Sequence, residues 1–356
     1  MTKKDAVIVY GAGISGRGAA QVLADRKQQV YLYNDMDCTL EPQQLQLLES
    51  VGGGLAIGQA AFEGLLDIAG VLVLSPGIAC DNANVLLAEQ RGLEVISEVE
   101  LGYRLYGGHI AAITGTNGKT TTTTIVGEML KRLPEPSAVG GNIGLALSKE
   151  VESLPQDGWL AAELSSFQLE KVSSFCPDIA VVLNLTPDHL ERHHTMEAYG
   201  EAKKNIFRQQ GEVQVTVLNY DDPIVRTWGA ETKGRLCYFS RKEKLQQGIY
   251  MQDGNFIISW DGKQETVCNI SELHLFGGHN EENVLAAIAC GFFAGVSISD
   301  MADVLRNFRS IEHRIEYVAT IDGVPYYNDS KATNTDSTIK ALEAFKDGHI
   351  ILLAGG

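Results

Sequence analysis

A glycine-rich turn that ends in a lysine is the strongest chemical signal in the sequence. Its residues follow an apolar run and lead into a threonine-rich helix: Gly115, Thr116, Asn117, Gly118, Lys119, Thr120 and Thr121. Backbone N–H groups and the positive end of a helix dipole meet at such a junction, so it suits phosphate. Lys119 can then lie along the phosphates, and the Thr120 hydroxyl can ligate their Mg²⁺. The sequence therefore predicts a nucleoside triphosphate site.

This turn departs from the usual phosphate-loop pattern. That pattern has a glycine five positions before Gly118, and Ile113 stands there instead, so the loop is a shorter variant. The alternative interpretation is a threonine-rich loop that enters an ordinary helix. Packing gives little reason for a lysine beside two glycines at a strand-to-helix junction, which favours the phosphate site.

The metal ion of a triphosphate site needs hard oxygen ligands from other strand ends. Glu163 follows an apolar run and precedes two serines, so we expect its carboxylate to ligate Mg²⁺. The alternative is a solvated glutamate at a strand end.

A polar cluster follows another buried run, and its members are Asn184, Thr186, Asp188 and His189. His189 comes soonest after the strand edge among the histidines, so we predict it as a metal ligand. The alternative is a turn and a helix cap, with Asp188 capping. We expect His193 and His194 to lie on the surface.

The first ninety or so residues alternate between strand and helix patterns, which predicts a parallel sheet covered on both faces. Gly11, Gly13 and Gly16 have the spacing of a dinucleotide-binding fingerprint, and Asp35 lies at the end of the next strand. Those glycines only permit close approach to a diphosphate, which UDP also carries. An NAD(P)-binding dehydrogenase or redox sensor with an accessory NTPase domain therefore stays open.

Ser75, Pro76 and Gly77 form a further turn after a strand of this first sheet. They would lie at the carboxyl edge, where ligands of open α/β sheets bind. The alternative is a plain turn that ends the strand.

The strand pattern restarts near residue 109 and indicates a second, larger α/β domain. Asp-Gly pairs at 253–254 and 261–262 predict antiparallel hairpins, and residues 279–296 predict a helix. The last segment reads as a hairpin turning at 322–323, a helix and one more strand. A single strand-helix-strand unit cannot bury both faces of its sheet, so we expect the chain to stop inside a domain.

Composition narrows the partners and the compartment. The chain has 356 residues and a formal net charge of -16, which argues against general binding to nucleic acid or to an anionic membrane. Its six cysteines have no close pairs, so neither a zinc site nor a disulfide framework is predicted. We find no signal peptide and no membrane-spanning run, and we expect a cytoplasmic monomer.

The motifs taken together resemble the Mur ligases along the whole chain. The segments that carry the resemblance are GAGISG, SPGI, GTNGKTT, GGNIG, ELSSFQLE, NLTPDHLERH, EAYGEAKKNIF, FGGHNEENVLAA, EHRIEYV and NDSKATN. ELSSFQLE and SPGI are similar to the members that add D-glutamate. The resemblance implies an ATP-dependent ligase of peptidoglycan precursor synthesis. It would join D-glutamate to UDP-N-acetylmuramoyl-L-alanine through an acyl phosphate, with ATP and two Mg²⁺ ions.

The same resemblance implies a three-part α/β fold. A Rossmann-like UDP-binding domain would span residues 1–97, and a central P-loop ATPase-like domain with added β-hairpins would bind ATP over residues 98–310. Residues 311–356 would start a third Rossmann-like domain, the incomplete C-terminal ligase domain. Family members continue beyond this point and take most of their D-glutamate contacts from it. We therefore expect a C-terminally truncated chain that binds substrates without ligating them.

The resemblance also implies roles for individual residues around ATP. Lys119 would hold the β and γ phosphates, Thr120 and Glu163 the first Mg²⁺, and His189 the second. Lys203 matches a lysine that family members carry as a carbamate, which adds an oxygen ligand beside Mg²⁺. The adenine-binding positions are Asn280 and Asn283. The positions that close over ATP and the acyl phosphate are Arg314, Asp329 and Lys331.

The substrate positions implied by the resemblance lie mostly in the first domain. Ile14, Ser15 and Asp35 match contacts to uridine and diphosphate, and Asn142 matches a contact to the muramoyl group. The turn at 75–77 would complete this set. The catalytic positions would be Lys119, His189, Lys203 and Lys331.

Overall fold

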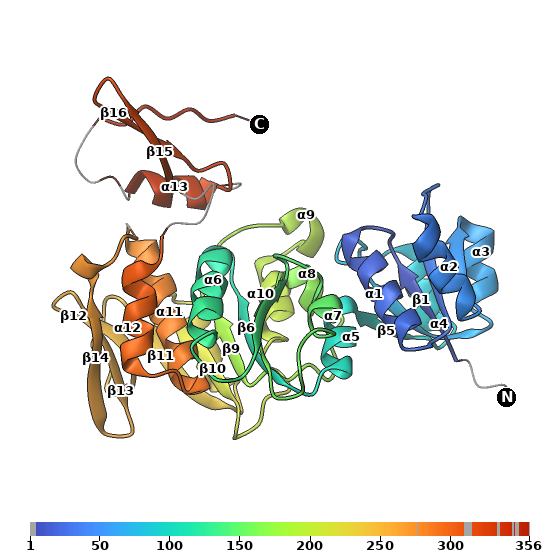
Figure 1. Cartoon of the computed structure of the whole chain (residues 1–356), viewed down its shortest axis with the longest axis horizontal. Helices are drawn as coiled ribbons and strands as arrows, with labels where there is room; N and C mark the ends of the chain where they lie inside the picture. Colours follow the sequence, from blue (N-terminus) through green and yellow to red (C-terminus); the bar gives the residue numbers. More distant parts are fainter. Residues whose placement is uncertain are drawn as a thin grey trace. The chain divides into compact units, whose positions relative to one another are not determined.

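The structure is a computed structural model that describes residues 5–275, 277–309, 315–332, 335–343, 345 and 349–355. The chain divides into two compact units, each described by itself below. The first contains residues 1–114, 135–180 and 189–214, and the second contains residues 115–134, 181–188 and 215–356 (Figure 1). The predicted domain boundaries at residues 97 and 310 stay a prediction.

The first unit begins with a five-stranded sheet, all of it parallel. Its strands are β1 (Ala6–Tyr10), β2 (Val30–Asn34), β3 (Gly54–Ile57), β4 (Ala69–Leu74) and β5 (Glu94–Ser97). They lie in the order β3-β2-β1-β4-β5. The intervening helices are α1 (Ile14–Asp25), α2 (Pro42–Ser50), α3 (Gln59–Leu65) and α4 (Ala83–Gln90). This order is that of a Rossmann-like domain, as predicted.

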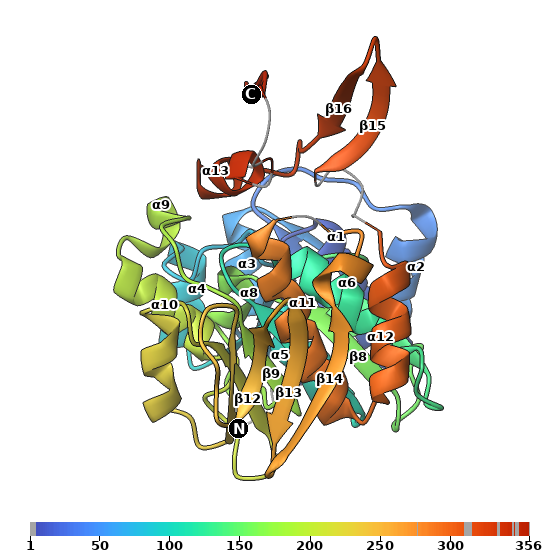
Figure 2. The same cartoon turned by 90° about the vertical axis from the view of Figure 1, so that its left-hand side faces the viewer.

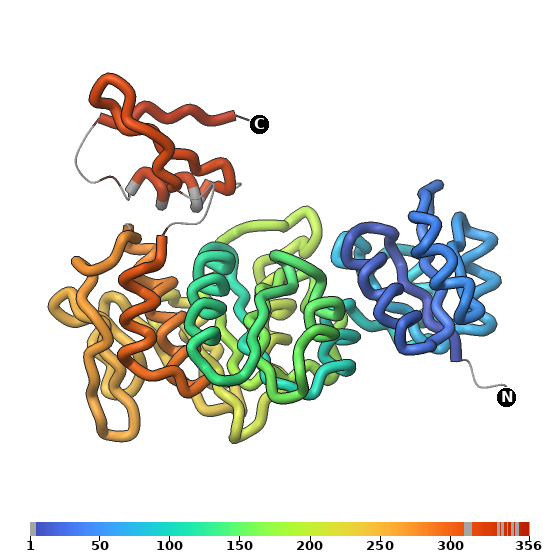
Figure 3. Tube along the Cα trace, viewed as in Figure 1, coloured from blue at the N-terminus to red at the C-terminus, as the bar shows by residue number. Residues whose placement is uncertain are grey.

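Side-chain alternation along each strand builds two cores, one on each face of this sheet. In β1, Val7 and Val9 join a core with α1 and α2, whereas Ile8 and Tyr10 join the opposite core with α3 and α4. Because successive side chains of a strand point to opposite faces, an uninterrupted apolar run fills both cores. Figure 3 lets the reader follow the chain, in blue to cyan, as it alternates between strand and helix.

The remainder of the first unit carries three more parallel strands. They are β6 (His109–Thr114), β7 (Ser137–Gly141) and β8 (Trp159–Glu163), in the order β6-β8-β7. The helices are α5 (Glu98–Leu105), α7 (Leu147–Glu150), α8 (Ser166–Leu169), α9 (Leu190–His193) and α10 (Met196–Lys204). The register pairs Glu163 with Ile113 on one side and with Gly141 on the other. The carboxyl ends of the three strands therefore meet at the Glu163 side chain.

The second unit contains α6 (Lys119–Leu130), β10 (Val215–Asn219), β11 (Arg235–Ser240), β12 (Gly248–Gln252), β13 (Asn255–Trp260) and β14 (Lys263–Asn269). β10, β11 and β12 are parallel, whereas β13 and β14 add antiparallel hairpins (Figure 2). Two helices, α11 (Gly278–Ala294) and α12 (Ile298–Asn307), pack on α6, with α11 over β10 to β12. Short 3₁₀ helices span Val225–Ala230 (η1) and Ile270–Glu272 (η2), and β9 (Ile179–Val182) spans the division of the chain between the units.

The predicted hairpin turns are confirmed. Asp253 and Gly254 have φ angles of 50° and 75°, and Asp261 and Gly262 have 49° and 75°. Positive φ at both central residues is the type I′ geometry that joins two twisted strands through two residues. A third turn of this kind joins β15 (Glu316–Ile321) to β16 (Val324–Asn328), ahead of α13 (Thr335–Glu343).

Some sequence predictions of elements are wrong. We did not expect β3, β7 or β11; β3 and β7 contain glycines, which lower strand propensity. We expected a final strand in the last residues, but residues 349–355 form none in the structure. A strand needs a partner for its N–H and C=O groups, and in the described part of this segment β15 and β16 pair with each other.

Candidate functional site

The predicted phosphate loop, residues 115–118, joins β6 to α6. Gly118 is the N-cap of α6 with φ of 86°, and a Cβ added there would collide with Oδ1 of Asn283. Only glycine therefore fits this position. The first-turn N–H groups of α6 have no intrahelical acceptor, and they point along the positive end of the helix dipole. The loop thus has the form of an anion site.

The lysine of the loop folds back over it. Nζ of Lys119 donates to the carbonyl oxygens of Gly115 at 3.0 Å and of Thr116 at 2.8 Å. These bonds hold the cation at the mouth of the loop, beside the start of α6. An arriving polyphosphate would meet a positive charge that is already in place.

Asn184 clamps the same loop from the segment that follows β9. Its Oδ1 accepts hydrogen bonds from the backbone N–H groups of Thr116 at 3.1 Å and Asn117 at 2.8 Å. Its Nδ2 donates to the Asn117 carbonyl at 3.1 Å. The sequence placed Asn184 in a polar cluster but assigned it no role, because the contact joins residues far apart in the chain.

Asn283 lies in the first two turns of α11 and packs against the loop. It is buried, its Oδ1 accepts from the Thr122 hydroxyl at 3.4 Å, and its Nδ2 donates to Oδ1 of Asn280 at 3.2 Å. The N-cap of this helix is Gly277 and not Asn280. Binding of adenine by the two asparagines stays a prediction.

Glu163 is a buried carboxylate at the end of β8. Nδ2 of Asn142 donates to its Oε1 at 3.0 Å, and the Asn142 N–H donates to the Glu163 carbonyl at 2.8 Å. Its Oε2 is buried and has no hydrogen-bond partner in the described part of the chain. An unsatisfied buried carboxylate oxygen is costly, and a cation would satisfy it. The end of β6 adjoins Glu163, since the N–H of Leu164 donates to the Ile113 carbonyl at 2.9 Å.

His189 and Lys203 share one aromatic neighbour, Tyr199. Nζ of Lys203 lies 4.5 Å from the centroid of the Tyr199 ring, and the His189 ring lies 6.5 Å from that ring and 4.8 Å from Phe167. Lys203 is only 1% exposed, which is unusual for an ammonium group. His189 itself is the left-handed N-cap of α9, with φ of 52°, so Asp188 does not cap this helix.

The surface placement predicted for His193 is wrong, whereas His194 is exposed as expected. The His193 ring stacks on Phe167 with centroids 5.4 Å apart, and its Nε2 lies 2.9 Å from Oγ of Ser166. His193 follows His189 by four residues around a single helical turn, so both rings face Phe167. Burial lowers the pKa of His193.

Arg192 ties this helix to the loop after β4. It donates to Glu170 through Nε at 3.3 Å and through a terminal nitrogen at 2.6 Å, and the latter also donates to the Ile78 carbonyl at 2.9 Å. Cys80 donates its thiol proton to Glu170 at 3.0 Å, and burial raises the pKa of that thiol to about 12. The segment that follows the turn, residues 78–80, is thus held against Glu170 and α9.

The glycine turn of the first sheet is closely packed. Oγ of Ser75 donates to the Gly11 carbonyl at 3.0 Å, and a Cβ on Gly16 would collide with that carbonyl. These contacts bring the predicted Ser75 turn and the glycine fingerprint together. Ile14 is 81% exposed at the start of α1, beside the half-buried Ser15, and is available to a ligand. Pro76 and Gly77 continue the turn at the surface.

Asp35 is held by buried tyrosines at the same edge of the sheet. Its Oδ2 accepts from the Tyr10 hydroxyl at 2.6 Å, and its Oδ1 accepts from the Tyr33 hydroxyl at 2.8 Å and from Nδ2 of Asn84 at 3.2 Å. Burial, together with Asp35, raises the pKa of both phenols, that of Tyr10 to about 12. Both phenols therefore keep their protons at any ordinary pH and donate hydrogen bonds to Asp35.

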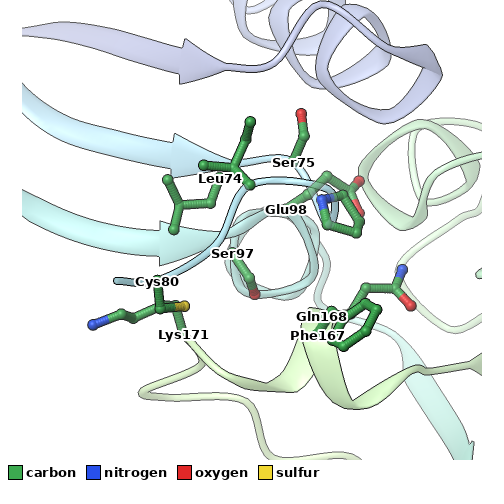
Figure 4. A pocket seen from close by; sticks show the side chains of 10 residues that line it. Leu74, Ser75, Cys80, Ser97, Glu98, Phe167, Gln168 and Lys171 are labelled. Atoms are coloured by element: carbon green, nitrogen blue, oxygen red, sulfur yellow. The ribbon is translucent and has the colours of Figure 1, made fainter. Parts of the chain in front are cut away.

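Figure 4 shows a small pocket between the loop after β4 and helix α8. Its volume is about 10 Å³, close to the space that one water molecule needs. Ser75, Ser97, Glu98, Phe167 and Lys171 are among its lining residues. Glu98 is fully buried, and burial raises the pKa of this carboxyl.

The third group of predicted residues lies in and after the last hairpin. Oδ1 of Asp329 accepts from the Ile315 N–H at 3.1 Å, and Lys331 is exposed. Arg314 lies outside the described residues. Closure of these residues over a nucleotide stays a prediction.

Two features are absent from the described residues. Within the ranges given above, no helix is long and apolar enough to cross a membrane. In the same ranges, no group of three or more His, Cys, Asp or Glu side chains could hold a metal ion. Mg²⁺ commonly binds through one or two carboxylates together with phosphates and water, so such a cluster is not required for it.

Residues 113–291 match the family described as the Mur ligase middle domain. The chain is 42% identical over 98% of its length to the UDP-N-acetylmuramoylalanine–D-glutamate ligase of Thermoanaerobacter sp. (strain X514), covering 77% of that protein. Among solved structures, MurF from Acinetobacter baumannii has a TM-score of 0.58 at 17% identity, over 96% of this chain and 71% of that one. A second is the UDP-N-acetylmuramate:L-alanyl-gamma-D-glutamyl-meso-diaminopimelate ligase from Neisseria meningitides. Its TM-score is 0.56 at 22% identity, over 86% of this chain and 99% of that one.

The solved structures bear on the fold alone, and they agree with the predicted α/β architecture. The sequence match is much closer and covers nearly the whole chain. The chain therefore belongs to the Mur ligase family. Within that family its similarity is to the D-glutamate ligases, at 42% identity to two Thermoanaerobacter enzymes.

Proposed function

We propose that the chain catalyses the ATP-dependent addition of D-glutamate to UDP-N-acetylmuramoyl-L-alanine, a step of peptidoglycan precursor synthesis. The observation that carries the proposal is 42% identity over 98% of the chain to ligases of that name. The phosphate loop supports it independently, because a glycine N-cap, a helix N-terminus and Lys119 suit a triphosphate.

The reaction forms an amide from a carboxylate and an amine. The γ-phosphate of ATP passes to the carboxylate of the L-alanyl group, which gives an acyl phosphate and ADP. The amine of D-glutamate then attacks the acyl carbon, and inorganic phosphate leaves. Several anions meet in such a reaction, so the protein has to supply positive charge where they approach.

Lys119 would supply that charge along the β and γ phosphates, and the α6 terminus would bind the same phosphates. Thr120, Glu163, His189 and a carbamylated Lys203 are the proposed ligands of two Mg²⁺ ions, which when bound would neutralise charge on the phosphates. The orphan Oε2 of Glu163 fits a cation ligand. The complete burial of Lys203 fits a side chain that is not an ordinary ammonium group.

The first sheet would bind the UDP part of the substrate. Its glycine turn permits a close approach of diphosphate, and Asp35 offers an oriented hydrogen-bond acceptor at the same edge. Asn142 would contact the muramoyl group. Both substrates are cytosolic metabolites in this proposal, so we expect a cytoplasmic enzyme that acts as a monomer on small molecules, without nucleic acid or membrane.

Calorimetric titration with UDP-N-acetylmuramoyl-L-alanine tests the proposal, with NADH in parallel. We expect saturable binding of the UDP-sugar and none of NADH. A second titration with Mg-ATP tests the loop, and release of phosphate that depends on D-glutamate tests the reaction. Binding of NADH alone would show that the glycine fingerprint serves a dinucleotide and would refute the proposal.

A further inference from the structure

The phosphate loop is shaped by hydrogen bonds to a neighbouring segment, residues 183–186. Asn184 makes three hydrogen bonds to it: two from loop N–H groups to its Oδ1 and one from its Nδ2 to a loop carbonyl. Asn184 thus uses both ends of its amide, as acceptor and as donor, on two successive loop residues. A side chain that bonds both an N–H and a C=O group of the loop backbone fixes the conformation of that backbone as well as its position.

A second tie lies two residues further along the same segment. The Thr186 N–H donates to Oγ1 of Thr116 at 3.0 Å, and Oγ1 of Thr116 donates in turn to the Thr186 carbonyl at 3.1 Å. The backbone N–H of Thr116 also lies 3.1 Å from the Asn184 carbonyl oxygen. A Cβ on Gly115 would stand 2.9 Å from Cβ of Leu183, so the glycine lets the two segments approach this closely.

These bonds decide which N–H groups of the loop face an anion. The N–H groups of Thr116 and Asn117 are turned toward Asn184. The N–H groups of the first turn of α6, which begins at Lys119, have no intrahelical acceptor and can face a phosphate. A loop without Asn184 would have to find this arrangement when the nucleotide binds, and the affinity would fall by the fraction of time it spends there.

We infer that Asn184 is a positioning residue that holds the phosphate loop in its anion-binding shape and thereby sets the affinity for ATP. The inference rests on the proposed function for the identity of the nucleotide. It needs no contact between Asn184 and the ligand, since Asn184 acts through Thr116 and Asn117.

Hydrogen exchange and calorimetry on three variants of the full chain test this inference. Asn184→Ala removes all three bonds. Asn184→Asp keeps a side chain of the same shape that can accept from both N–H groups, but it cannot donate and adds a negative charge beside the loop. Asn269→Ala is the matched control: Asn269 also makes three side-chain hydrogen bonds, to Ser271 and Asn255, away from this loop.

In Asn184→Ala we expect the Asn117 amide to exchange at least about tenfold faster, because the side-chain bond no longer protects it, whereas the Thr116 amide keeps its bond to the main-chain carbonyl of residue 184. The dissociation constant for Mg-ATP should rise about tenfold if the loop is competent a tenth of the time. Binding of UDP-N-acetylmuramoyl-L-alanine should be unchanged. Asn184→Asp should weaken Mg-ATP binding with smaller changes in exchange, and Asn269→Ala should change neither property.

Wild-type exchange at the Asn117 amide in Asn184→Ala would overturn the inference, as would faster exchange with unchanged affinity for Mg-ATP. If Asn184→Ala does not fold, unchanged affinity in Asn184→Asp would refute it instead. If the wild-type chain binds no Mg-ATP, the proposed function is refuted. The exchange rates would still decide whether Asn184 fixes the conformation of the loop.

Discussion

The tyrosine pair that holds Asp35 gives a sharp test of the first sheet. Tyr33→Phe removes one hydroxyl and keeps the ring, which packs on Tyr10 with centroids 4.9 Å apart and on Phe62 at 4.7 Å. The lost bond is the 2.8 Å contact from the phenol to Oδ1 of Asp35. Asn84 also loses an acceptor at 3.1 Å, but it keeps its bond to Asp35.

The expected cost follows from the charge on the acceptor. A hydrogen bond to a charged group contributes about 1.5–3 kcal/mol. Asp35 is exposed to solvent, which screens its charge, so we expect the lower end, about 1.5 kcal/mol, for Tyr33→Phe. The matched control is Tyr31→Phe on the same strand, where the phenol donates to the neutral carbonyl of Gly52 at 3.0 Å. It should cost about 0.5–1 kcal/mol.

Native-state hydrogen exchange of the amides of β2 measures this difference, since it reports the opening free energy of that strand in a chain of two units. A double-mutant cycle with Asp35→Ala isolates the pair. We expect a coupling of about 1 kcal/mol between Tyr33→Phe and Asp35→Ala, and none between Tyr31→Phe and Asp35→Ala.

Additive effects of Tyr33→Phe and Asp35→Ala would refute the reasoning. They would mean that the phenol contributes through packing and that Asp35 is not oriented by it. The same result would remove the argument that Asp35 is prepared as an acceptor for a nucleotide.

Three further predictions concern the loop and α9. Lys119→Ala should weaken Mg-ATP binding about tenfold or more, since a charge-assisted bond is lost, and calorimetry should show no such change in Lys131→Ala at the other end of α6. Gly118→Ala should destabilise the chain in urea by more than the ~1–2 kcal/mol of left-handed strain, because its Cβ collides with a side chain of α11. Gly262→Ala, at φ of 75° with open space around it, should show the strain alone, and equal costs would contradict the collision. Burial lowers the pKa of His193. Below pH ~6.5 the ring is therefore protonated in the unfolded chain while it is still neutral in the folded one, so the free energy of unfolding should fall as the pH drops. His193→Gln should flatten the pH dependence of urea unfolding between pH 5 and 7, and an unchanged slope would count against burial as the cause.

Much of the fold could be predicted because its signals are local. The Asp-Gly turns require positive φ at two adjacent residues, and only a few residue pairs accept that geometry. The phosphate loop is similar, since its glycines and its lysine lie within six residues of one another. The parallel sheet with helices on both faces could be predicted because its strands are apolar throughout and are separated by helices. A parallel sheet covered on both faces buries such strands.

The wrong predictions concern segments whose local sequence carries little information about structure. β3 has four residues after a run of glycines, so its propensity is weak, and it forms because β2 offers a partner along its edge. His193 looked like a surface residue of a polar segment. It is buried because one helical turn brings its ring onto Phe167, which belongs to a different segment.

The sequence by itself determined most of the strands, the hairpin turns and the family, because each depends on residues that are close neighbours or on motifs in a fixed order. Only the tertiary structure decided which polar side chains meet. Asn184 and the phosphate loop are 67 or 68 residues apart, and Asn84 and Asp35 are 49 apart. Such contacts depend on strand order and helix packing, which no local propensity encodes. The residues proposed for the site could therefore be named from the sequence, whereas the groups that hold the loop in shape could not.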